Sequence, residues 1–231
     1  MPHDRTRLAA AALTVAGVLF LLYPALRPWA DETTVDGAVH SMSSPWWVAT
    51  HLFAMIGFIL VPLALLPVNH IAAVIMWIGA GLTLPYYGAE DFALNTIATK
   101  VADGQQLDLL GLAEHIRYHP AAITTFLIGL ILLGVGAVMA AVAIWRSRAL
   151  PRFSGVLFGA GFALFIPQFF IGEAGRIAHG VLMMAGCLWL AVSLFRTPSR
   201  SALDRLHPDG RLDHPAGIAP TEWAAMPRTR R

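Results

Sequence analysis

Hydrophobic residues in this chain are gathered into six long runs, and none of the runs has a Lys, Asp or Glu in its central part. An α-helix rises about 1.5 Å per residue and the hydrocarbon core of a bilayer is about 30 Å thick, so a crossing helix needs about 20 apolar residues. The pattern therefore predicts an all-α integral membrane bundle of about six transmembrane helices. The predicted helices cover residues 8–26, 46–66, 71–87, 121–145, 153–171 and 174–195.

The third run is the least regular, because Pro85 lies near its end. Proline removes one helical hydrogen bond and kinks a helix, so we expect the helix to bend there and to continue through residues 90–97. Residues 102–119 are polar enough to lie outside the membrane, and their leucines predict a short interfacial helix. Residues 197–231 are rich in Pro, Gly, Asp and Arg, which predicts a mobile polar cytoplasmic tail after the bundle at 1–196.

The composition supports a membrane protein and excludes some other classes. Hydrophobic residues make up 57% of the chain and charged residues 13%, whereas soluble domains contain about 25% charged residues. The net charge of +2 gives nucleic-acid binding no electrostatic support. Cys187 is the single cysteine, so an intrachain disulfide is excluded.

Lysine and arginine are distributed unevenly between the segments that join the predicted helices. With a cytoplasmic N-terminus, twelve of the 16 basic residues fall on the cytoplasmic side and four on the outer side. Cytoplasmic segments carry the excess of Lys and Arg in membrane proteins. The sequence therefore predicts a multi-pass protein of the cell membrane with both termini cytoplasmic. A cleaved signal peptide stays an alternative for the first helix, although Pro28-Trp29-Ala30 is a poor cleavage site.

Ionisable residues near the predicted helices gather on the outer side in this topology. A charged side chain within a span is costly and normally faces the bundle interior or a wet cavity, so a shared pocket in the outer leaflet is the economical interpretation. Simpler roles are also open, since Glu173 and Arg176 have the spacing of a helix-surface ion pair. The residues of the predicted pocket are His51, Glu90, Asp91, His115, His119, Glu173, Arg176 and His179.

Carboxyl and imidazole groups in an apolar pocket point to an intramembrane enzyme that uses acid–base chemistry. Glu90 is the first candidate for the general acid, and Asp91 and Glu173 are further catalytic candidates. His51 and His179 would act as the base or orient the acid. The aromatic residues nearby predict a hydrophobic, lipid-like or isoprenoid substrate, and proton-initiated cyclisation of a prenyl chain is one concrete reaction.

The same residues allow a second hypothesis, in which the protein binds a divalent metal ion or haem. His51, His179 and Glu90 could supply a two-histidine, one-carboxylate ligand set, which His115 or His119 would complete. Two His-x-x-x-Met pairs, which end at Met55 and Met183, place an imidazole and a thioether on one helix face, a spacing suited to copper or haem iron. The alternative is that both methionines pack in the core.

Three short segments carry a resemblance to a known family. The runs from Pro45 to Gly57, from Tyr86 to Leu94 and from Arg176 to Gly180 resemble a family of small, uncharacterised bacterial polytopic membrane proteins. That resemblance implies no function.

The histidine–methionine spacing also resembles haem-binding helices of the cytochrome b561 type. That type needs two histidine pairs across the bilayer, and the inner side offers only His70. A third hypothesis, a small-solute carrier or a structural partner subunit, is open because six helices around polar residues could pass a solute. The oligomeric state is not defined by the sequence.

Overall fold

The part of the chain that the structure describes, residues 3–147 and 149–196, is built from helices and contains no strand. The structure is a computed structural model. The all-α prediction is confirmed, whereas the predicted tail at 197–231 lies outside the described residues. The elements are α1 His3–Leu26, α2 Val35–Met42, α3 Pro45–Leu65, α4 His70–Gly88, the π-helical turn η1 Ala89–Ala93, α5 Leu94–Ala102, α6 Leu109–Tyr118, α7 Pro120–Ser147, α8 Arg152–Ala163, the 3-10 turn η2 Pro167–Phe170 and α9 Glu173–Phe195.

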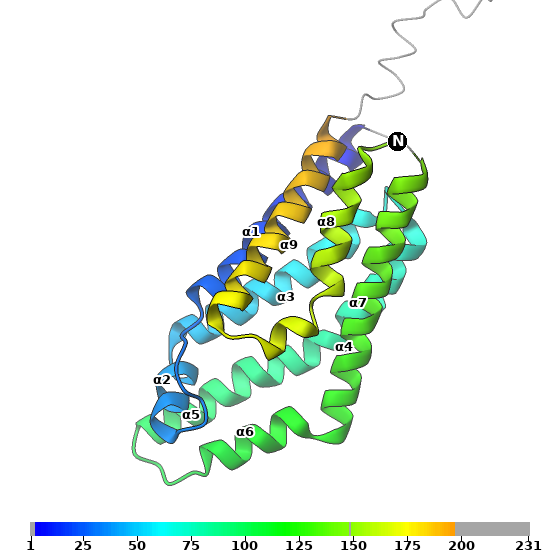
Figure 1. Ribbon diagram of the computed structural model, residues 1–231. Helices are drawn as coiled ribbons and strands as arrows, with labels where there is room; N and C mark the ends of the chain where they lie inside the picture. The colour runs from blue at the N-terminus through cyan, green and yellow to red at the C-terminus, as the bar shows by residue number, and fades with distance from the viewer. Residues whose placement is uncertain (1–2, 148, 197–231) are drawn as a thin grey trace, which may run out of the picture. The chain divides into compact units, whose positions relative to one another are not determined.

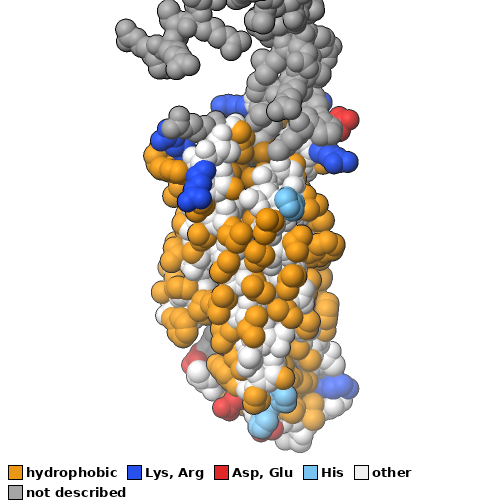
Figure 2. Space-filling view, turned by 90° about the vertical axis from the view of Figure 1, so that its right-hand side faces the viewer, with side chains coloured by type: hydrophobic (Ala, Val, Ile, Leu, Met, Phe, Trp, Pro, Cys, Tyr) orange, Lys and Arg blue, Asp and Glu red, His pale blue; other side chains and the backbone are white. Residues whose placement is uncertain are grey.

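Five helical segments in this part of the chain are long and apolar enough to cross a membrane. Their outward faces are apolar, as the exposed side chains of Leu63, Ile78 and Ile131 illustrate. Figure 2 shows a broad hydrophobic belt on one face, with charged side chains toward the two ends. The fold is therefore that of a helical bundle compatible with an integral membrane protein. The five segments are Asp4–Leu26, Pro45–Leu65, His70–Ala102, Pro120–Ser147 and Glu173–Phe195.

The sixth predicted span, at 153–171, is not one continuous helix. The α8 helix has 12 residues and ends at Ala163, which gives it a length of about 18 Å, short of the bilayer core. The α-helical ladder ends at Leu164, because the N–H of Phe165 donates to the carbonyl oxygen of Phe162 only three residues earlier. Pro167 has no N–H to donate to the carbonyl oxygen of Ala163, so the ladder is not restored at that position. The chain continues through η2 to reach the start of α9.

The helices form an antiparallel bundle with both ends of the described chain at the same end (Figure 1). The α1 helix packs against α3 and α9, and α7 packs against α4 and α8. The three short helices α2, α5 and α6 lie together at the opposite end, and we call them the cap. One hydrophobic core fills the bundle, and a second, smaller one, which includes Met42, Trp47, Leu94 and Leu109, fills the cap.

The predicted continuation of the third span through 90–97 is confirmed, since α4, η1 and α5 run without interruption to Ala102. The predicted short helix in 102–119 is also confirmed as α6. The α2 helix was not predicted, because it has only eight residues and no long apolar run. It begins at a local signal, in which the side chain of Thr34 accepts a hydrogen bond from the backbone N–H of Gly37.

Candidate functional site

A cavity of about 530 Å³ lies where the bundle meets the cap. Its volume is within the range of about 300–1,000 Å³ that is usual for small-molecule sites. Most of the wall is apolar, with Ile123, Leu127 and Ile166 among its aliphatic residues. Most aromatic residues of the wall come from α1, α4, α7 and η2, and these are Tyr23, Tyr86, Tyr87, Phe126, Phe169 and Phe170.

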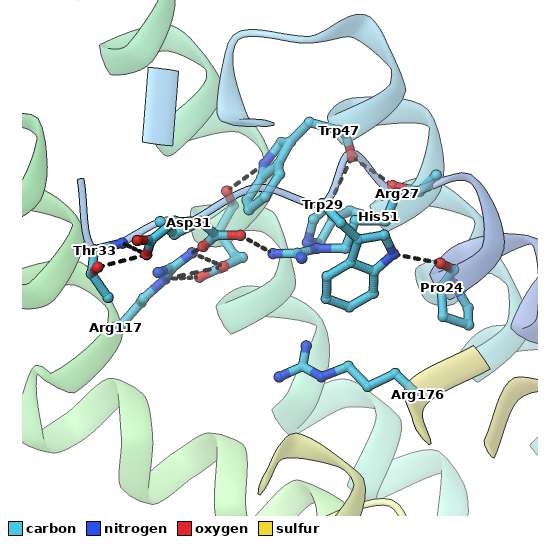
Figure 3. Close-up of polar contacts among 12 residues, drawn as sticks. Pro24, Arg27, Trp29, Asp31, Thr33, Trp47, His51, Arg117 and Arg176 are labelled. Atoms are coloured by element: carbon cyan, nitrogen blue, oxygen red, sulfur yellow. Dashed lines mark hydrogen bonds and ion pairs between the residues drawn. The ribbon is translucent and has the colours of Figure 1, made fainter. Parts of the chain in front are cut away.

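Five charged residues line the polar side of the cavity, and four of them form one chain of ion pairs (Figure 3). Arg27 pairs with Glu32, and Glu32 also accepts a hydrogen bond of 2.8 Å from the Nη2 atom of Arg117. Arg117 continues to Glu90 through Nη2, at 2.6 Å from Oε1, and through Nε, at 3.0 Å from Oε2. The network thereby ties the α1–α2 loop, α6 and η1 together.

This network is largely shielded from solvent, because its side chains are only 8–21% exposed. Burial opposes the ionisation of Glu32, but the guanidinium groups of Arg27 and Arg117 outweigh it and lower the pKa of that carboxyl group below its ordinary value. Burial likewise opposes the charge of Arg117, and the carboxylates of Glu90 and Glu32 outweigh it and raise the pKa of the guanidinium. The charges are thus mutually stabilised.

Aromatic rings hold two of the three arginines of the cavity in place. The guanidinium carbon of Arg27 lies 4.5 Å from the ring centre of Trp29 and 4.7 Å from that of Trp47. The guanidinium carbon of Arg176 lies 5.5 Å from the ring centre of Trp29 and 5.3 Å from that of Phe169. Such cation–π contacts orient a guanidinium without neutralising its charge. Trp29 is itself fixed by a hydrogen bond from its indole N–H to the carbonyl oxygen of Pro24.

His51 lines the cavity and is 1% exposed. Its Nδ1 atom is 2.7 Å from the carbonyl oxygen of Trp47. A carbonyl oxygen can only accept, so Nδ1 carries the proton of that hydrogen bond. Within the described residues no hydrogen bond engages Nε2, which leaves this atom as the one able to exchange a proton with a bound molecule.

The other predicted catalytic residues do not join His51 around one point. Glu90 lines the cavity, but Arg117 occupies its carboxylate. Asp91 is 0% exposed, does not line the cavity, and has no hydrogen-bond partner for its carboxyl oxygens among the described residues. His179 lies outside this cavity, where its Nε2 atom is 2.8 Å from the carbonyl oxygen of Gly161. Glu173 is exposed at the start of α9 and forms no ion pair with Arg176.

The predicted metal-ligand set does not assemble in the structure. His115 and His119 are exposed on and just after α6, and the Nδ1 atom of His115 is engaged by the carbonyl oxygen of Gly111. Residues 3–147 and 149–196 contain no group of three or more His, Cys, Asp or Glu side chains placed to hold a metal ion. Met55 and Met183 lie in the bundle core, as expected for methionines that fill irregular gaps.

The residues that sequence reasoning missed are Arg27, Glu32 and Arg117. They were predicted to lie in loops outside the membrane, where ion pairs are usually solvated and weak. For the two arginines the sequence did offer a signal in their positions, because Arg27 directly follows one apolar run and Arg117 lies shortly before another. Charges at such places lie at the rim of a bundle, within reach of any cavity that opens there.

Fold and cavity together define the chain as a helical bundle that is compatible with an integral membrane protein and carries a charged cavity at one end. No family model matches it, and neither does any curated protein or solved structure. The assignment of a function therefore depends on the chemistry of the cavity.

Proposed function

We propose that this protein is a multi-pass protein of the cell membrane that binds a lipid-like molecule in the cavity beneath the cap. The observation that carries this proposal is the composition of the wall, in which aromatic and aliphatic side chains surround a buried, internally paired set of charges. A ligand with a long apolar part and a small polar part matches such a wall. A polar solute would find few hydrogen-bonding groups on this wall and would lose its own hydration on entering the cavity.

The apolar wall also offers a route from the bilayer. Leu127 of α7 and Phe170 of η2 both line the cavity and are both exposed, Phe170 by 85%. The sides of a membrane-spanning bundle face lipid, so an exposed apolar residue shared by the cavity and the outer surface marks a lateral entrance. A lipid-like molecule would enter between α7 and η2 with its polar end toward the ion-pair network.

The geometry favours binding over the predicted isoprenoid cyclisation. That reaction needs a proton donor inside the cavity. Glu90 is held as the partner of Arg117, and Asp91 does not line the cavity. His51 is the residue of this site that is placed to take up or release a proton, should the bound molecule react.

Binding can be tested with a photoactivatable hexadecanol that carries a mid-chain diazirine. In phosphatidylcholine vesicles we expect its crosslinks to concentrate on cavity residues of α7 and η2, such as Phe126 and Phe169. Replacing Ile123 and Ile166 with tryptophan together should reduce these crosslinks several-fold, because both side chains line the cavity. The control is Ile131→Trp, on the exposed outer face of α7. Crosslinks spread evenly over the outer faces, and unchanged by the paired substitution, would contradict the proposal.

We further propose that the cap faces the outside of the cell and that both termini are cytoplasmic. The excess of basic residues in the segments at the terminal end supports this orientation. In intact cells, Gln106→Cys in the exposed α5–α6 loop should react with a membrane-impermeant maleimide. Arg146→Cys, exposed at the other end of α7, should react only after permeabilisation. The buried Cys187 serves as the internal background. The reverse labelling pattern would overturn the orientation.

A further inference from the structure

The fixed charges that line the cavity do not cancel. Three arginines, Arg27, Arg117 and Arg176, and two glutamates, Glu32 and Glu90, contribute to the wall. Both carboxylates are used by Arg27 and Arg117. An unbalanced charge in a largely apolar environment is costly unless another group compensates it.

The unbalanced charge resides on Arg176. Among the described residues no carboxylate lies within ion-pair distance of its guanidinium, including that of Glu173 three residues earlier. Figure 3 shows Arg176 below the ring of Trp29, beside the network and without a contact to it. The ring contacts with Trp29 and Phe169 leave the charge uncompensated.

Arg176 is nevertheless held in a defined position. Its Nη2 atom donates a hydrogen bond of 3.1 Å to the carbonyl oxygen of Phe169. A guanidinium has five N–H donors in a rigid fork, so most of its donors stay available to a ligand. Phe169 and Arg176 both line the cavity, and the available donors are therefore next to the space that a ligand would fill.

Resting on the function proposed above, we infer that the ligand is an acidic amphiphile whose carboxylate or phosphate head binds Arg176. The guanidinium fork matches the geometry of both groups and forms charge-assisted hydrogen bonds with them. The hydroxyl groups of Tyr23 and Tyr86, which also line the cavity, can donate further hydrogen bonds to the head. Phe126 and Ile166 line the apolar space for the tail, on the side of the lateral entrance.

The head group can be identified by competition against the neutral diazirine probe. Hexadecyl phosphate and palmitate should displace the probe at concentrations at least tenfold lower than hexadecanol or hexadecyltrimethylammonium. Inorganic phosphate should not displace it at millimolar concentration. Arg176→Gln should remove the preference for the acidic amphiphiles over hexadecanol, because the charge-assisted hydrogen bonds to the acidic head are lost. Arg176→Lys should keep a reduced preference. Arg152→Gln, which removes a surface arginine that contacts Trp145 at the far end of the bundle, is the matched control.

The head-group assignment and the lipid-binding proposal would be contradicted by different results. Equal competition by acidic, neutral and cationic amphiphiles would overturn the head-group assignment and leave the lipid-binding proposal intact. Competition by inorganic phosphate as strong as that by hexadecyl phosphate would show that the site takes a free anion and would overturn the assignment. A preference that survives in Arg176→Gln would place the anion at another residue. Absence of any cavity crosslink would instead contradict the proposed function itself.

Discussion

Replacing Arg117 with glutamine should destabilise the protein more than any other single change at the cavity rim. Arg117 pairs with both Glu32 and Glu90. Among the described residues, no other side chain joins α6 to η1 and to the α1–α2 loop by ion pairs. Removing one partner of a buried pair leaves charge without compensation, which costs about 3 kcal/mol. Thermal unfolding in detergent, followed by tryptophan fluorescence, would measure the loss as a lower midpoint.

The pH dependence of unfolding separates this effect from a general packing defect. The pKa of Glu32 is lowered from its ordinary value of 4.5, so its stabilising contribution is complete above that pH and is lost as pH falls through the lower folded value. The wild type should therefore lose stability below about pH 4.5. Arg117→Gln should show a smaller loss over the same interval, because one of the two guanidinium groups that stabilise the carboxylate is gone. Arg152→Gln, an exposed arginine on α8, should leave both the midpoint and its pH dependence unchanged.

Most of the bundle was predictable because apolar runs of membrane length have few alternatives to helix. The five long segments follow those runs closely, and even the continuation beyond Pro85 follows from helical hydrogen bonding that resumes after a proline. The sixth run was equally apolar and yet is broken near Pro167. Hydropathy measures how favourably side chains transfer from water to lipid. It carries no information on where the backbone hydrogen bonds of a helix are interrupted.

The candidate site was predictable only in part, because it depends on pairing between distant residues. His51 and Glu90, which both line the cavity, were singled out in the sequence because ionisable groups in or beside apolar runs are conspicuous. Glu32 and Arg117 are 85 positions apart, and no local pattern indicates that they meet. His179 satisfied the same sequence criterion as His51 but faces the carbonyl oxygen of Gly161 instead of the cavity. Position along a span gives depth in the membrane, whereas the direction of a side chain depends on helix packing.

Helix packing in turn depends on small residues that the hydrophobic pattern does not distinguish. At the contact of α4 and α7, a β-carbon added to Gly79 would lie 2.7 Å from the carbonyl oxygen of Gly129 and 2.8 Å from the backbone nitrogen of Leu133. Backbone atoms of a packed helix cannot give way as a flexible side chain can. The two helices therefore approach closely only because both positions are glycine, as in other membrane helix pairs.

Gly79→Ala should consequently destabilise the bundle by about 1–3 kcal/mol, since overpacking forces the two backbones apart. Gly81→Ala, two residues further along the same helix, is the matched control, because an added β-carbon there meets nothing within 4 Å. That control should be neutral or stabilising, by up to about 1 kcal/mol, because alanine is the better helix former. Detergent unfolding of both variants would measure the difference in midpoint. Equal midpoints would mean that α4 and α7 do not pack through Gly79, and the position of Tyr86, Tyr87 and Glu90 on the cavity wall would then need to be revised.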